Sequence, residues 1–134
     1  MNELQGRIIG IEVNGNLSLV VVEVLAGLSL QAIVIDTPET ASYLKMNNQV
    51  LVVFKQTEVV IGVGEQLQIS IENQIPARIT QIEKGKLLCK LTLESKAGKL
   101  SSIISTAAAE TLKLKQGDSV LAMVKLNEVM LRGL

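Results

Sequence analysis

The sequence of this chain repeats itself, and the repeat restricts the possible folds more than any other feature. Residues 50–61 and 120–131 close the two halves with Lys, Glu and Val in the same frame, so that Lys125 follows Lys55 by 70 positions. Residues 2–8 align with residues 73–79 at an offset of 71. Agreement at both ends of each half predicts two copies of one small unit. The offset changes by one where a loop gains or loses a residue.

Each copy is predicted to consist mainly of β-strands. Hydrophobic residues make up 48% of the chain, and most of them are Val, Ile and Leu, of which the β-branched types favour sheets. Apolar runs alternate with turn-forming residues such as Asn14-Gly15-Asn16 and Lys84-Gly85-Lys86, as in hairpins. The strands predicted in this way lie at residues 7–13, 17–25 and 30–35, at residues 78–83, 87–93 and 100–104, and after the turns at 47–48 and 116–118.

Each copy is also predicted to contain one short helix. In Thr37-Pro38-Glu39-Thr40, a proline and a carboxylate stand where the first turn of a helix favours them. Residues 105–112 are rich in alanine, which has the highest helix propensity. The expected fold class is mainly β, with two tandem OB-like β-barrels that each carry one short helix. The first repeat would span residues 1–62, a linker residues 63–68 and the second repeat residues 69–134.

The small size of each repeat favours assembly. A unit of about 65 residues buries only around 60% of its surface and is marginally stable alone. Packing the two units together, or packing them again in an oligomer, would relieve that weakness. The repeat therefore indicates a self-associating protein before any ligand is considered.

The composition argues against several classes of protein. The chain has no histidine and a single cysteine, Cys89, so it lacks the groups of His-dependent catalytic triads and of the usual zinc sites. Its 13 basic and 13 acidic residues cancel, and its only aromatic residues are Tyr43 and Phe54, whereas single-strand nucleic-acid binders need basic grooves and stacking aromatics. We therefore expect neither an enzyme nor a nucleic-acid partner.

The expected location is the cytoplasm. No apolar run approaches the roughly 20 residues that span a bilayer, and the first residues show no basic segment followed by an apolar stretch, as a signal peptide would. A lone cysteine suits a reducing compartment. We expect Cys89 to be a buried strand thiol, Tyr43 and Phe54 to be core residues, and no membrane partner.

A set of motifs in the second copy resembles the molbindin family, also called the Mop or TOBE domain, in its tandem form. The family frame is Ser-x-x-Asn-Gln-Leu, a Thr/Ser-rich helix start, Leu-x-Leu-x-x-Gly-x-x-Val and a Lys before the end of the last strand. The matching residues here are 70–75, 105–106, 112–120 and Lys125. The first copy keeps Asn2, Leu4, Thr37, Thr40, Leu44, Val50 and Lys55. Together the copies cover nearly the whole chain, and neither a winged helix nor a Walker motif is recognised, so the chain is similar to the free-standing cytoplasmic members.

The resemblance implies an oxyanion ligand, molybdate or tungstate, bound between subunits of a homo-oligomer, with a trimer as the family's form. The anion would be held for storage or homeostasis, without an organic cofactor and without direct metal ligands. Carried over residue by residue, the oxyanion-binding candidates are Thr37, Thr40, Lys55, Ser70, Ser105, Thr106 and Lys125.

The chemistry of these residue types suits that ligand. Molybdate and tungstate are dianions whose four oxygens accept hydrogen bonds and donate none. Serine and threonine hydroxyls can turn to donate, and lysine adds three N–H donors and a full charge. Phosphate near neutral pH carries a proton on much of its population, and that proton would lack an acceptor, at a cost of about 1–3 kcal/mol.

Two departures from the family frame keep an alternative open. Family members often carry Arg where this chain has Glu72, and an acidic side chain beside a dianion repels it unless it turns away. The first copy begins at Met1-Asn2 and shows no preceding Ser-x-x. The alternative is a TOBE-type structural or interaction module that has lost anion binding. In that case Thr37 and Ser105 would serve as helix N-caps, and Lys55 and Lys125 as polar strand ends.

Overall fold

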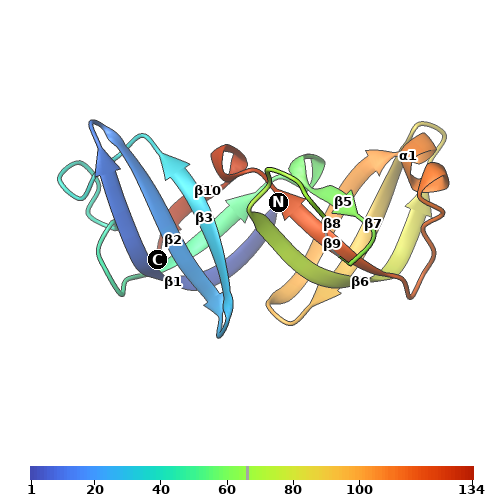
Figure 1. Ribbon diagram of the computed structural model, residues 1–134, viewed down its shortest axis with the longest axis horizontal. Helices are drawn as coiled ribbons and strands as arrows, with labels where there is room; N and C mark the ends of the chain where they lie inside the picture. Colours follow the sequence, from blue (N-terminus) through green and yellow to red (C-terminus); the bar gives the residue numbers. More distant parts are fainter. Residues whose placement is uncertain (66) are drawn as a thin grey trace.

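The computed structural model describes residues 1–65 and 67–134 and divides them between two five-stranded, strongly curled sheets that lie side by side along the long axis (Figure 1). Ten strands account for most of the chain, which confirms the mainly β class. The first sheet has the strand order β10-β4-β1-β2-β3, and the second has the order β5-β9-β6-β7-β8. All pairings within both sheets are antiparallel.

The first repeat contributes five strands, and the second repeats their order. The strands of the first repeat are β1 (Asn2–Asn14), β2 (Leu17–Leu25), β3 (Leu28–Val34), β4 (Gln49–Phe54) and β5 (Val60–Gly62). Those of the second are β6 (Asn73–Lys84), β7 (Leu88–Ser95), β8 (Gly98–Ser105), β9 (Ser119–Val124) and β10 (Met130–Gly133). The predicted repeat is therefore present strand by strand.

The two repeats exchange their last strands. β5 leaves the first repeat and pairs with β9, from Val60 opposite Met123 to Gly62 opposite Leu121. β10 leaves the second repeat and pairs with β4, from Met130 opposite Val53 to Gly133 opposite Val50. A short 3-10 turn precedes each crossing, η1 (Gln56–Glu58) before β5 and η2 (Leu126–Glu128) before β10. Each sheet is thus completed by the other repeat, and the expected linker, residues 63–68, includes residue 66, which lies outside the described residues.

The alternation of buried and exposed residues along the long strands explains the sheets. In β1, Asn2, Leu4, Gly6 and Ile8 are buried while the residues between them are exposed, the period of two that a sheet with one covered face requires. Phe54 is 1% exposed and Cys89 is fully buried, whereas Tyr43 is partly buried against the core. The expected core positions of Phe54 and Cys89 are confirmed, and Tyr43 lies at the edge of the core.

Only one of the two predicted helices forms. In the second repeat, α1 (Thr106–Thr111) begins after Ser105, whose hydroxyl accepts a hydrogen bond from the amide of Ala108. The helix predicted from the alanine-rich run is therefore confirmed, and Ser105 is its N-cap. The helix expected at Thr37 is instead a turn, in which the amides of Thr40 and Ala41 both reach the carbonyl of Thr37. The Thr40 hydroxyl accepts from the Thr37 amide at 2.8 Å. Such local side-chain bonds compete with helix formation, and this segment lacks the alanines that favour α1.

Candidate functional site

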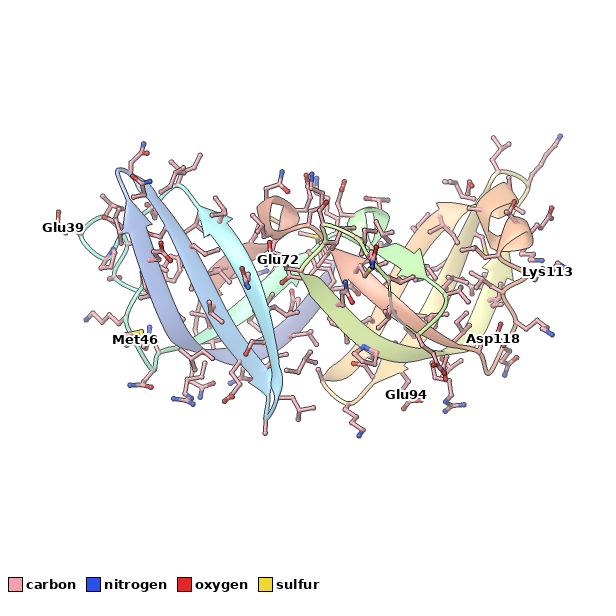
Figure 2. The ribbon with its side chains drawn as sticks, viewed as in Figure 1. Glu39, Met46, Glu72, Glu94, Lys113 and Asp118 are labelled. Carbon is pink, nitrogen blue, oxygen red and sulfur yellow. The ribbon has the colours of Figure 1, made fainter. Side chains whose placement is uncertain are left out.

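The structure distributes the seven predicted site residues over three places in the chain. Thr37 and Thr40 flank Glu39, which lies at one end of the long axis, and Ser105 and Thr106 start α1 at the opposite end (Figures 1 and 2). Lys55 and Lys125 immediately precede η1 and η2, where the repeats meet. Ser70 is exposed two residues before Glu72, which Figure 2 places near the middle of the molecule. A single chain therefore does not bring the hydroxyls of its two ends to the lysines.

The end of the first repeat has an acidic environment. The Thr40 hydroxyl donates to the Asp36 carboxylate at 3.0 Å, so its proton is already used. The Thr37 hydroxyl accepts from the amide of Glu39 at 3.3 Å. Burial, and then the negative charge of Asp36, raise the pKa of Tyr43 nearby. Carboxylates at Asp36 and Glu39 make this end unfavourable for a dianion.

At the end of the second repeat, one of the two hydroxyls can still donate its proton to a ligand. Thr106 donates to the carbonyl of Gly85 at 2.9 Å, which anchors α1 to the turn between β6 and β7. Ser105 accepts from Ala108 at 3.0 Å, so its own proton remains available to another acceptor. Ser105 is exposed and Thr106 is half-buried. Of the two ends, this one has the better set of donors.

The middle of the molecule has approximate twofold symmetry. Lys55 and Lys125 are both exposed and both extended in backbone conformation, with φ of −72° and −65°. Since η1 packs on β8 and η2 packs on β3, each lysine stands at a crossing between repeats. The two positions are equivalent in the fold, which is what the recurrence of Lys in the sequence predicts.

The surroundings of the two lysines differ in detail. Gln56, next to Lys55, accepts a hydrogen bond on its Oε1 from the hydroxyl of Ser101 in the second repeat, at 2.9 Å. The equivalent neighbour of Lys125 is Leu126, an apolar residue. Glu72 is exposed and precedes Asn73 by one position in the second repeat. The Lys55 position is therefore richer in polar groups.

Two asparagines hold the middle together, a role that their residue type alone does not reveal. Asn2 is 4% exposed, and its side chain donates to the carbonyl of Ser101 at 2.9 Å and accepts from its amide at 2.8 Å. Asn73 makes the same pair of bonds with Gln31, at 2.8 and 2.7 Å. Each asparagine thus binds the edge strand of the other repeat like a short piece of backbone. The recurrence of Asn in the family frame was the only signal that marked these positions.

The described residues give no sign of a conventional metal centre or membrane helix. Within residues 1–65 and 67–134, no group of three or more His, Cys, Asp or Glu side chains could hold a metal ion. No helix in the same part of the chain is long and apolar enough to cross a bilayer.

Comparisons with known proteins agree with the fold. The family model described as the TOBE domain matches residues 69–131. Molybdenum-pterin-binding protein 2 of Clostridium pasteurianum is 35% identical over 66 residues, which cover 48% of this chain and 97% of that protein. Molybdenum-pterin-binding protein 1 of the same organism is 33% identical over the same coverage. The cytoplasmic molybdate-binding protein ModG, solved with molybdate bound, aligns with a TM-score of 0.89 at 24% identity, over 99% of this chain and 96% of ModG.

Proposed function

Because the chain belongs to the TOBE-domain family that includes the molybdenum-pterin-binding proteins, we propose that it binds molybdate or tungstate as an intact tetrahedral oxyanion. It would act in the cytoplasm, in storage or homeostasis of the anion, and without catalysis. The name of its relatives and the ligand of ModG support the choice of anion.

The observation that carries this proposal is the equivalent placement of Lys55 and Lys125 at the two crossings between repeats. With 13 basic and 13 acidic residues, the chain has no net field to attract a dianion, so the affinity must come from local donors. An ammonium group donates charge-assisted hydrogen bonds, which are the stronger kind. Both lysines are exposed in the single chain and open to a ligand from outside.

We place the anion at contacts between copies of the chain, in a homo-oligomer with three subunits. Except for Ser70, the hydroxyl candidates lie at the ends of one chain, whereas the lysines lie in its middle. A site that joins the hydroxyls at the start of α1 to a lysine therefore needs a neighbouring copy. Large apolar side chains are exposed at both ends, with Ile35 75% exposed at one and Leu87 77% exposed at the other. Burial of such side chains favours self-association. Sedimentation analysis would measure the number of subunits.

Calorimetric titration with molybdate, tungstate, sulfate and phosphate tests the function. We expect binding of the first two and weaker binding of phosphate, because its proton lacks an acceptor. Replacing Lys55 or Lys125 with Ala should weaken molybdate binding by about ten- to a hundredfold, the loss of one hydrogen bond to a charged group. Lys45→Ala is the matched control, since this exposed lysine lies in the turn region after β3. Unchanged affinity in both lysine variants would remove these residues from the site.

Glu72 supports a second candidate function, that of a structural or interaction module without an anion. Its carboxylate is exposed in the second repeat, at the position where the family frame favours Arg. If it weakens a site, Glu72→Arg should raise molybdate affinity, while Glu12→Arg, at an exposed position of β1, should not reproduce the gain. If neither the wild type nor Glu72→Arg releases or absorbs heat on titration with any of the four anions, the function is that of a structural or interaction module.

A further inference from the structure

A groove of about 600 Å³ lies between the repeats, where the β2–β3 hairpin of the first meets β6 and β9 of the second. In Figure 1 the tips of the β2–β3 and β7–β8 hairpins approach each other at this side of the molecule. The apolar part of its lining includes Leu25, Leu28, Pro76, Ala77 and Val120. Charged side chains, Arg78, Glu94 and Lys96, stand at its margin. The seven oxyanion candidates are absent from the lining.

The pocket at the equivalent place in the first repeat is smaller, and two glutamines in its lining are bonded to each other. Gln5 donates from Nε2 to Oε1 of Gln49 at 3.2 Å, across β1 and β4. The pocket at that place has a volume of about 260 Å³. The register of β6 on β9 puts Pro76 and Ser119 at the equivalent positions. Proline and serine cannot form such a bridge. The groove of the second repeat is also bordered by the β2–β3 hairpin of the first, whereas the counterpart hairpin does not line the smaller pocket.

Arg78 is bound less firmly than its counterpart Arg7. Arg7 donates to Asn47 at 2.7 Å and to Glu23 at 3.3 Å. Arg78 faces Glu94 at the longer distance of 3.7 Å. In the second repeat, Gly117 occupies the position that Asn47 has in the first. Its amide donates to the carbonyl of Ile79, as the amide of Asn47 donates to that of Ile8, but glycine has no side chain to accept from Arg78.

Arg78 consequently has N–H donors available beside an apolar groove. A guanidinium carries five N–H donors in a planar arrangement that fits a carboxylate or a sulfonate. With Lys96 added, the charged residues of the margin sum to a net positive charge. The volume lies within the range of about 300–1,000 Å³ that is common for small-molecule sites.

From this geometry we propose a second binding site, in which the groove takes a small organic anion with an apolar body and one acidic group. The apolar body lies against Leu25, Leu28 and Pro76, and the acidic group binds Arg78. This site is independent of the oxyanion site proposed above, because it shares no residue with it. It is present once per chain, since the first repeat lacks both the space and the available arginine.

The probe for this site is 1-anilinonaphthalene-8-sulfonate, an apolar fluorophore with one sulfonate. With the full-length protein we expect a saturable rise of fluorescence at one probe per chain. The neutral analogue N-phenyl-1-naphthylamine, which lacks the sulfonate, should bind at least about tenfold more weakly, as should the sulfonate probe to Arg78→Gln. Arg7→Gln is the matched control and should leave probe binding unchanged.

A second variant tests the space rather than the charge. Ser119→Gln places in the second repeat the residue found at the equivalent position of the first, Gln49. Its longer side chain should weaken probe binding at least about tenfold while the urea unfolding midpoint stays close to that of the wild type. Molybdate titration of the same variant separates the two sites, because we expect its oxyanion affinity to be unchanged. Non-saturable fluorescence, equal losses in Arg78→Gln and Arg7→Gln, or full binding by Ser119→Gln would each overturn the proposal.

Discussion

The side-chain amide of Asn73 forms two hydrogen bonds with the backbone of Gln31, which is 42 residues away in the other repeat. Asn2 repeats this arrangement with Ser101 across 99 residues. β3 and β8 are edge strands of their sheets, so their outward N–H and C=O groups would otherwise lack partners from a strand. The two asparagines therefore cover sheet edges and join the repeats at the same time.

Replacing Asn73 with Ala should lower the free energy of unfolding by about 2–4 kcal/mol. The change removes two hydrogen bonds and leaves the backbone groups of a half-buried Gln31 unpaired, each at a cost of about 1–2 kcal/mol. Urea unfolding monitored by circular dichroism measures the loss. Asn127→Ala serves as the control, because this asparagine is exposed on η2 and should be nearly neutral. Equal stability of the two variants would contradict the role given to Asn73.

The repeat and the strands could be predicted from the sequence because they depend on local patterns. The alternation in β1 and β6 and the alanines with Ser105 at α1 each specify their own conformation. The exchange of β5 and β10 could not be predicted. Both repeats offer an apolar edge of nearly the same sequence, at β4 and β9, and a strand pattern does not say which copy its partner belongs to.

The candidate site was predicted less completely, for a related reason. Residue types suggested donors at Thr40 and Thr106, but the structure shows that their protons go to Asp36 and to the carbonyl of Gly85. Whether a hydroxyl is free depends on neighbours that the sequence does not place. The groove and its available arginine were missed because they depend on differences between equivalent positions, Ser119 in place of Gln49 and Gly117 in place of Asn47. A residue-by-residue comparison of the two repeats would have revealed these differences.

The exchanged strands should hold the two repeats together without a covalent link. We expect polypeptides 1–65 and 66–134, produced in one cell, to copurify as a 1:1 complex, because β5 and β10 each pair with the sheet of the other repeat. Ending the second polypeptide at residue 129 removes β10 and should weaken the complex by at least about tenfold, or 1.4 kcal/mol. Size-exclusion chromatography and calorimetry provide the measurements. Two halves that separate as folded monomers would show that the exchange adds nothing to their association.

Replacing Lys113 with Gly should stabilise the protein by about 0.5–1 kcal/mol, because relief of about 1–2 kcal/mol of left-handed strain exceeds the roughly 0.5–1 kcal/mol that glycine loses in backbone entropy. Lys113 follows the end of α1 and adopts a φ of 53°, in the left-handed region that favours glycine. Its amide donates to the carbonyl of Glu110, a bond that glycine would keep. Thermal unfolding measures the gain. Lys113→Ala is the control, since alanine removes the same side chain but remains strained at this φ, and an equal gain in both variants would assign the effect to the lost side chain.

The thiol of Cys89 should make stability depend on pH above 9. Burial raises its pKa above the ordinary value of 9.0, and the nearby Lys84 offsets only part of that rise. The folded state therefore holds the thiol proton more tightly than the unfolded state does. This contribution is fully present below pH 9.0 and is lost as the pH rises through the folded-state pKa.

The matched variant is Cys89→Ser, because serine occupies the equivalent buried position in the first repeat, at Ser18. Urea midpoints of the two proteins, measured from pH 7 to pH 10, should run parallel at the lower values and diverge above 9, with the wild type falling more steeply. The native thiol should also react slowly with Ellman's reagent, since the side chain is fully buried. Parallel midpoints over the whole range would mean that the thiol ionises equally in the folded and unfolded chains, and that its burial leaves the proton affinity unchanged.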